Sequence, residues 1–341
     1  MKSVFVGIDL AIAKNKPLPI CFCYWDGPRL IPLAVRRLSH RPPRGKGNLA
    51  VLDGHTVAEF VDSAAYYIAA VSSELGCRVE RIGIDAPRAA RAEGVTRRKA
   101  ELTMDSAGIS CFTTPSATEF QQIFDKVKRH IADGGAENRL PHANQLWMHV
   151  GFKLYERLSK VAPCIEVFPQ ATARAIGTGA LHKSKTGAVV AQLRQAAKYT
   201  GWPSGDVVEY LFDELGFGSA HDRLDAYLSA WVAALSDSQR VAMGEPPDDV
   251  IWVPKVGVLV SKEPNVSLSR RKPQPGKKRY QPSGTCEKLC PACGKHTFKR
   301  WPFGWDAHAA HKCTGLESSG ERDRRAEFRE KYSYLFPGKG K

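Results

Sequence analysis

Three short and mainly apolar runs open the chain, and their length and composition are typical of β-strands. They cover residues 3–8, 18–25 and 29–37. The Asp26-Gly27 pair between the second and third runs favours a tight hairpin turn. Pro32 lies inside the third run and predicts an edge strand, because proline cannot donate a ladder hydrogen bond. The chain therefore begins as an antiparallel meander.

Helical periodicity then alternates with short strand-like runs. The predicted elements are helix 56–75 with Thr56 as its cap, strand 78–86, helices between 88 and 160 with breaks at 113–116 and 133–141, strand 164–168, and helices 170–176, 187–200, 206–215 and 221–235. The segment VIWVP adds a last strand or packs against the domain. This order predicts an α/β fold, with a mixed sheet of three antiparallel strands followed by parallel strands, flanked by helices. The RNase H-like fold shares this order.

Length and composition allow one large domain and an appendage. The chain has 341 residues, of which 43% are hydrophobic, which is enough for a substantial core. Beyond Val260 the sequence becomes polar, basic and proline-rich, as in a linker. The predicted organisation is a catalytic domain at 1–258, a linker at 259–285, a zinc finger at 286–316 and a basic tail at 317–341.

Positive charge is concentrated near the C-terminus. The net charge is +15, and residues 251–341 hold 20 Lys and Arg against 8 Asp and Glu, which leaves only +3 for the first 250 residues. Such asymmetry favours nucleic acid, DNA or RNA, as the partner, with a solubilising tail as the alternative. The residues expected to contact phosphates are Arg270, Arg271, Lys272, Lys277, Lys278 and Arg279.

Neither a membrane span nor a secretion signal is expected. No apolar run approaches the roughly 20 residues that cross a bilayer, and Asp9 interrupts the apolar start. The scattered cysteines of the first 250 residues are interpreted as reduced core thiols. We therefore expect a cytoplasmic protein with no membrane partner.

Two pairs of aspartates carry the candidate chemistry. Asp222 and Asp225 lie three residues apart in helix 221–235, which places both carboxylates on one face, at the flank of an apolar stripe. A solvated helix face is the alternative interpretation. Asp9 and Asp85 each end a strand-like run, and the carboxyl ends of neighbouring strands meet at one edge of a sheet. Carboxylate oxygens suit Mg²⁺ or Mn²⁺, and two such ions would serve phosphodiester hydrolysis.

Five sequence blocks in order resemble a known family. The blocks are GIDLA, GIDAP, EVFPQATARAIG, HKSKTG and HDRLDAYLSAWVAA. They resemble a predicted nuclease family called domain of unknown function 429, an RNase H-like group, over roughly Met1 to Val253. Their order is also similar to that of RuvC-type Holliday-junction resolvases. The resemblance implies that Asp9, Asp85, Asp222 and Asp225 bind metal, although the RuvC type carries Glu at the position of Asp85.

Several other residues are accessory candidates, each with an ordinary alternative. Glu166 ends a strand-like run and is a candidate for a further metal ligand or a structural hydrogen-bond acceptor. His221 is a candidate for moving protons, orienting water or capping its helix. Lys183 and Lys185 contact a substrate phosphate or are ordinary loop lysines. Two further basic groups are candidates. Lys14 and Lys16 are expected to contact the nucleic-acid backbone, and Arg97, Arg98 and Lys99 to line a nucleic-acid channel, with a solvated helix face as the alternative for the second group.

A cysteine-rich segment near the C-terminus predicts a structural zinc site. Cys290 and Cys293 form CxxC, and with His308 and Cys313 they give the pattern C-x2-C-x14-H-x4-C. The pattern resembles the C2HC variant of the ββα zinc finger. His311 is the alternative to Cys313, and Cys286 is the alternative for one thiolate. So short a segment has little core without the ion, and an unmetallated cysteine-rich loop is the other interpretation.

Together these features predict a metal-dependent nuclease that acts on DNA or RNA and carries a zinc finger that binds nucleic acid. A non-catalytic nucleic-acid-binding scaffold with the same fold is the first alternative. A kinase of the actin-like ATPase fold is the second, but Gly7 and Gly83 precede their aspartates rather than forming phosphate loops after the strands. Cleavage of a branched substrate would favour a homodimer.

Overall fold

The chain divides into two compact units, which are described separately. A computed structural model describes residues 1–179, 187–256, 288–290, 292–293, 297–298, 309, 313–317 and 321–331. The first unit covers Met1–Asn265 and the second covers Val266–Lys341. The predicted linker at 259–285 lies outside the described residues, and so do Lys183, Lys185 and the six basic residues from Arg270 to Arg279.

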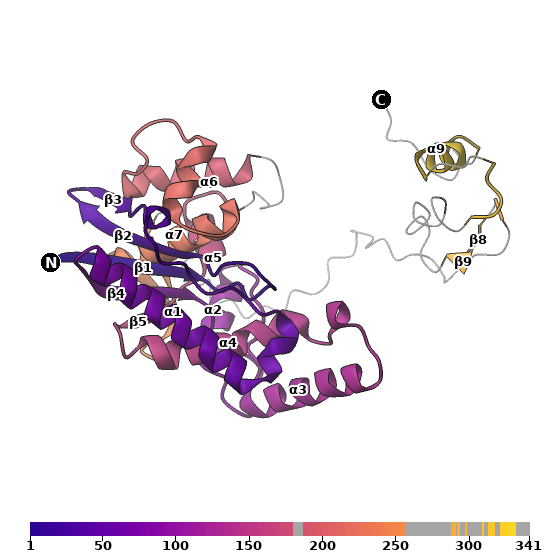
Figure 1. Cartoon of the computed structure of the whole chain (residues 1–341), viewed down its shortest axis with the longest axis horizontal. Coiled ribbons are helices and arrows are strands. Elements are labelled where there is room, and N and C mark those ends of the chain that lie inside the picture. The colour runs from indigo at the N-terminus through magenta and orange to yellow at the C-terminus, as the bar shows by residue number, and fades with distance from the viewer. Residues whose placement is uncertain are drawn as a thin grey trace, which may run out of the picture. The chain divides into compact units, whose positions relative to one another are not determined.

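A mixed sheet of five strands forms the centre of the first unit (Figure 1). Its strands lie in the order β3-β2-β1-β4-β5. They are β1 (Lys2–Asp9), β2 (Ile20–Asp26), β3 (Arg29–Pro32), β4 (Cys77–Asp85) and β5 (Cys164–Glu166). The first three pair antiparallel, whereas β1, β4 and β5 run parallel. The predicted α/β fold with a mixed sheet is confirmed, and β3 is an edge strand, as Pro32 indicated.

Helices cover both faces of this sheet (Figure 1). The described helices of this unit are α1 (Gly54–Glu74), α2 (Lys99–Ser106), α3 (Ala117–Ala132), α4 (Ala143–Leu158), α5 (Pro169–Ala175), α6 (Ala188–Thr200) and α7 (Ala220–Ala234). One apolar core lies between the sheet and the pair α1 and α4, and the other lies between the sheet and α7, with α6 packed against α7. None of the helices in the described residues has the length and apolar character needed to cross a membrane.

The alternation of side chains along β1 explains this two-faced core. Val4, Val6 and Ile8 are fully buried in the core beneath α1 and α4. Phe5 and Gly7 point to the opposite face, where Phe5 packs with the residues of α7 and a side chain on Gly7 would collide with that helix. Strand β4 repeats the pattern, with Ile82 and Ile84 on the first face and Gly83 on the second.

Several predicted element boundaries differ from the structure. The third strand stops at Pro32, and residues 35–37 form a 3₁₀ helix instead. Helix α1 begins at Gly54 because Asp53, rather than Thr56, is its cap and accepts hydrogen bonds from the amides of His55 and Thr56. The predicted helix 206–215 is a 3₁₀ helix, Glu209–Leu215. Segment VIWVP belongs to β7 (Asp249–Pro254), which pairs with β6 (Arg240–Glu245), a strand that the sequence did not reveal.

Small elements surround a buried centre in the second unit. They are β8 (Lys288–Leu289), β9 (Thr297–Phe298) and α9 (Glu321–Lys331). β8 and β9 pair antiparallel. Phe328 of α9 is fully buried with Leu316, Cys290 and Cys313. Part of the segment expected to be a basic tail therefore contributes an apolar residue to this small cluster.

Candidate carboxylate site and cysteine cluster

The first two aspartates lie side by side at one edge of the sheet. Asp9 and Asp85 are register partners and are the last residues of the parallel strands β1 and β4. Successive side chains of a strand alternate between the two faces. Asp9 therefore shares a face with Gly7, and Asp85 with Gly83, which is the face that α7 covers. The sheet itself brings these two carboxylates together.

Helix α7 runs antiparallel to β1 and β4. Gly218, just before the helix, lies against Pro19, whose carbonyl accepts a hydrogen bond from the Asp9 amide at 3.2 Å. At the other end of the helix, the Arg81 side chain donates to the Ala233 carbonyl at 2.9 Å. The N-terminal turns of α7 consequently lie over the carboxyl ends of the strands. Those turns contain Asp222 and Asp225.

Two glycines allow α7 to approach the sheet at backbone distance. A Cβ on Gly7 would lie 1.9 Å from the Ala226 carbonyl oxygen, and a Cβ on Gly83 would lie 2.4 Å from the Ser229 carbonyl oxygen. Asp222 and Asp225 precede these contact residues by one helical turn on the same face of α7. A turn rises about 5.4 Å, close to the 6–7 Å that two strand residues span, so the helix acids and strand acids reach the same level.

The surroundings of the helix acids differ from the sequence prediction. The apolar stripe is buried as expected, but every residue from Leu224 to Ala234 is buried too, so Asp225 does not lie at a solvent border, whereas Asp222 is half-buried. They extend the small-residue face of Ala226 and Ser229 that packs against the sheet. Asp225 is only 4% exposed. The alternative of a solvated helix face is therefore wrong for Asp225.

Asp222 is already engaged at the start of its helix. Its Oδ2 accepts hydrogen bonds from the Ser219 amide at 3.3 Å and the Ser219 hydroxyl at 2.6 Å, which makes a capping box. Its Oδ1 lies 2.9 Å from Nε2 of His221. His221 thus contacts both capping partners, since its Nδ1 lies 3.1 Å from the Ser219 hydroxyl. His221 is not itself the cap of α7, which is Ser219, but it contacts the side chains of both members of the capping box.

Glu166 is held by a buried arginine. It ends β5 beside β4, and its two carboxylate oxygens accept hydrogen bonds from two nitrogens of Arg98, each at 2.8 Å. The Arg88 amide donates to it at 3.0 Å. Both Glu166 and Arg98 are 7% exposed. Of the two roles predicted for Glu166, the structure supports the hydrogen-bond acceptor, because a bidentate arginine occupies the oxygens that a metal would need.

Burial and ion pairing shift the pKa values of Glu166 and Arg98 in opposite directions. Burial raises the pKa of Glu166, while the Arg98 guanidinium and the hydrogen bonds to it partly offset that rise. Burial alone would lower the pKa of Arg98, but Glu166 and Asp249 outweigh it, so that pKa is raised. Asp249 of β7 accepts from Arg98 at 3.0 Å, which ties the small sheet to this edge.

The basic residues beside Arg98 differ in exposure, since Arg97 is half-buried and Lys99 is exposed. Arg97 pairs with Glu101 and with Asp105 of α2, and the ammonium of Lys99 lies 3.4 Å from a Glu245 oxygen. These contacts neutralise the set that the sequence proposed for a nucleic-acid channel. A recess opens beside them. Its lining includes Asp85, Arg98, Phe112, Trp147, Glu166 and Phe168. The recess therefore places aromatic rings next to a carboxylate of the site.

The three acids at the sheet edge offer oxygen atoms, which are the ligands that hard divalent cations take. Asp9, Asp85 and Asp225 supply oxygens on one face of one edge. Their oxygens are too far apart to surround one ion by themselves. In the described part of the chain, three or more His, Cys, Asp or Glu ligand atoms lie within 4.8 Å of one another only in the cysteine group. Mg²⁺ keeps several waters and needs one or two protein carboxylates plus substrate phosphate, so the open arrangement is compatible with it.

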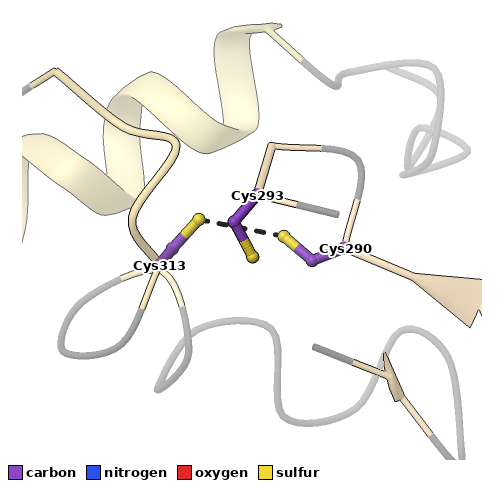
Figure 2. A group of neighbouring side chains, drawn as sticks. All are labelled: Cys290, Cys293 and Cys313. Carbon is purple, nitrogen blue, oxygen red and sulfur yellow. Dashed lines mark hydrogen bonds between the residues drawn. The ribbon is translucent and has the colours of Figure 1, made fainter. Parts of the chain in front are cut away.

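Three cysteines of the second unit converge on one point (Figure 2). The sulfurs of Cys290, Cys293 and Cys313 all lie within 4.8 Å of one another, and those of Cys290 and Cys313 are 3.8 Å apart. Gly315 makes this possible, because a Cβ there would lie 1.9 Å from the Ala292 carbonyl oxygen. The arrangement can hold a metal ion and is compatible with structural zinc.

Burial raises the pKa of the Cys313 thiol to about 11, and the neighbouring Cys290 adds to this shift. Three neighbouring thiols favour a cation, because metal coordination stabilises their thiolate form. The predicted ligand His308 and the alternatives His311 and Cys286 lie outside the described residues.

Comparison with known proteins finds one matching family model and no similar curated protein or solved structure. A family model matches residues 44–249, which include Asp85, Glu166, Asp222 and Asp225 but neither Asp9 nor the cysteine cluster. The family resemblance expected from Met1 is therefore matched only from residue 44 onward. Because the match covers more than half of the sequence, the chain belongs to the family described as "Protein of unknown function (DUF429)".

Proposed function

We propose that this protein is a metal-dependent nuclease of the RNase H-like type, which hydrolyses phosphodiester bonds of DNA or RNA. The observation that carries the proposal is the meeting of three carboxylates from distant parts of the chain at one sheet edge. Asp9 and Asp85 end neighbouring parallel strands, and α7 runs antiparallel to them so that Asp225 reaches the same level.

The sheet order supports the RNase H-like interpretation. Three antiparallel strands are followed by two parallel ones, and a helix packs across the central strands at backbone distance. The RuvC-type resemblance would assign the same roles to Asp9, Asp85 and the α7 pair. The RuvC type has glutamate at the position of Asp85. The shorter aspartate side chain extends less far from β4, which is consistent with the wide spacing of the carboxylate oxygens.

The metal would be held by Asp9, Asp85 and Asp225. Mg²⁺ or Mn²⁺ ions, two in the nuclease proposal, would supply a nucleophilic water and charge stabilisation for phosphodiester hydrolysis. The chain's own residues orient this edge. Ser219 and His221 fix Asp222 at the first turn of α7, and Arg98 fixes the end of β5 through Glu166. The recess beside Asp85 leaves room for part of a substrate next to the carboxylates.

We further propose that the cysteine cluster holds a structural zinc ion. Cys290, Cys293 and Cys313 would supply three ligands and His308 the fourth, with His311 and Cys286 as the alternative ligands. A site filled by four protein ligands is structural rather than catalytic. The basic residues of this part of the chain, including the set from Arg270 to Arg279, would then add affinity for nucleic acid.

A non-catalytic nucleic-acid-binding scaffold is the second candidate. The engagement of Asp222 in a capping box favours it, because a carboxylate that caps a helix needs no metal to explain its position.

Cleavage assays separate the two candidates. Labelled single-stranded, duplex and branched DNA and RNA are incubated with Mn²⁺ and the wild type, Asp85→Asn or Asp62→Asn. Asp62 is the matched control, an exposed aspartate whose partner is Arg157 on the face of α1 and α4. A nuclease loses roughly 100-fold or more of its activity in Asp85→Asn, since several kcal/mol of charge stabilisation are removed.

Equal cleavage by Asp85→Asn and wild type would overturn the nuclease assignment. No cleavage of any substrate, together with retained nucleic-acid binding, would favour the scaffold.

A further inference from the structure

A paired loop leaves the sheet directly after Asp9. Residues 12–18 and 43–47 run beside each other and exchange backbone hydrogen bonds. The Asn15 amide donates to the Gly45 carbonyl and the Gly45 amide to the Lys16 carbonyl, each at 2.8 Å. The Gly47 amide donates to the Ile12 carbonyl, also at 2.8 Å. We call these two segments the basic ribbon.

Packing holds the ends of the first ribbon segment and the contact between the two segments in place. Ile12 and Leu18 are buried in the core beneath α1 and α4, which anchors the first segment at its two ends. A Cβ on Gly45 would lie 2.4 Å from the carbonyl oxygens of Ile12 and Ala13, so the two backbones touch where a side chain would separate them. The Arg44 guanidinium also donates to the Asn15 carbonyl at 2.7 Å. The ribbon is therefore a defined surface rather than a loose loop.

The ribbon presents cations without compensating acids. Its charged residues are Lys14, Lys16, Arg44 and Lys46, all exposed. Neither segment contains an acid, and no Asp or Glu among the described residues forms an ion pair with these four. The nearby Arg36 and Arg37 behave differently, because they pair with Asp213 and Glu214. The positive charge of the ribbon is thus left for an external partner.

The cations of the ribbon lie near the carboxylate edge. Lys14 follows Asp9 by five residues, so its Cα lies at most about 18 Å from that of Asp9 even along a fully extended chain. Gly47 brings the two sides of the ribbon together, because its Cβ position would be 3.6 Å from Cβ of Lys14. Lys14 and Lys46 therefore lie on adjoining backbone, within a few nucleotide lengths of the candidate site.

We propose that the basic ribbon binds the sugar–phosphate backbone of nucleic acid and leads it to the carboxylate edge. The identity of the polyanion rests on the proposed function, while the surface itself rests on the pairing, exposure and uncompensated charge of the ribbon. Lysine and arginine that neutralise phosphates release condensed counterions, which makes the affinity depend on salt. The first 250 residues carry a net charge of only +3, yet this surface concentrates four cations and no acid.

The salt dependence of binding tests the ribbon directly. The full-length chain binds a labelled DNA duplex without added Mg²⁺ or Mn²⁺, and the logarithm of affinity is plotted against the logarithm of salt concentration. Each phosphate contact contributes about 0.9 to the slope on duplex DNA, so Lys14→Gln with Lys16→Gln should lower the slope by about 2. Lys14→Arg with Lys16→Arg should keep the wild-type slope.

A matched double variant at the other edge of the sheet is the control. Lys2 begins β1, and Lys160 precedes the start of the parallel strand β5, so both exposed lysines lie at the amino edge, away from Asp9. Lys2→Gln with Lys160→Gln should leave the slope unchanged. An unchanged slope in the ribbon variant, or an equal loss in the control, would overturn the proposal. Because binding is measured without cleavage, a smaller slope in a protein that cuts nothing would retain the ribbon and refute only the nuclease.

Discussion

The carboxylate edge and the cysteine cluster position their side chains by opposite means. Asp9, Asp85 and Asp225 are separated by 76 and 140 residues along the chain, and regular strands and a helix bring them together. The cysteines all fall between residues 290 and 313, in a region where strands are two residues long. In the first region packing between distant elements positions the ligands, whereas in the second the ligands are close together in the sequence.

Burial explains the difference. Helix α7 is buried along almost its whole length, and the sheet beneath it has apolar cores on both faces. The acids would therefore keep their places whether or not an ion is bound. The cysteine cluster has only Ala309, Leu316 and Phe328 as further buried apolar residues among those described. The core that these described residues form is too small to offset the entropy of ordering the chain, so we expect a bound ion to supply the difference.

The largest effect should follow from removing the cysteine ligands. Cys290→Ser should abolish binding of about one zinc ion per chain and unfold the second unit, because structural zinc contributes roughly 10–16 kcal/mol in zinc-finger peptides. The first unit should keep its melting temperature. Zinc content is measured with a chromogenic chelator, and unfolding is measured by limited proteolysis between residues 286 and 331.

Cys111→Ser is the control for that comparison. Cys111 lies in the first unit, half-buried and outside the cysteine cluster, so its replacement should change neither zinc content nor proteolysis of the second unit. A Cys290→Ser protein that retains its metal, or that resists protease as the wild type does, would show that the second unit holds itself together without the ion.

Much of the first region could be predicted from sequence because its central strands are short, mainly apolar runs that end at an acid. The run of residues 3–8 identified β1 and Asp9, the acid that follows it. The run of residues 78–86 identified β4 and Asp85 in the same way. The CxxC spacing of Cys290 and Cys293 was informative for a similar reason, since local spacing alone brings two sulfurs together.

Contacts between distant segments could not be predicted in the same way. The second buried face of α7 consists of small residues such as Ala226 and Ser229, which have no clear hydrophobic signature, so the acids were placed at a solvent border. Glu166 and Arg98 are 68 residues apart, and only the fold makes them partners. Strand β6 is short and largely half-buried, so its pattern resembles that of a loop.

The next largest effect concerns the Glu166–Arg98 pair. It tests how far the stability of the sheet edge depends on this buried ion pair. Glu166→Ala should lower the free energy of unfolding by about 3–5 kcal/mol, because it leaves the buried Arg98 without its bidentate partner. Chemical denaturation followed by circular dichroism measures the loss. Replacing both residues with apolar ones of similar size, Arg98→Met with Glu166→Leu, should restore most of it. A Glu166→Ala protein of unchanged stability that loses divalent-ion binding would instead make Glu166 a metal ligand.

The smallest effect concerns the backbone contact that brings Asp225 to the strands. Gly7→Ala places a methyl group where the Ala226 carbonyl oxygen lies, so α7 must shift, at a cost of about 1–3 kcal/mol in the free energy of unfolding. Gly54→Ala is the matched control: it lies in the first turn of α1 with nothing within 4 Å of an added Cβ, and it should be neutral or stabilise the protein by about 0.4–1 kcal/mol. Denaturant titration of both variants measures the difference. Equal stabilities would mean that α7 does not hold its acids by this contact. The carboxylate edge would then resemble the cysteine cluster, in depending on what it binds.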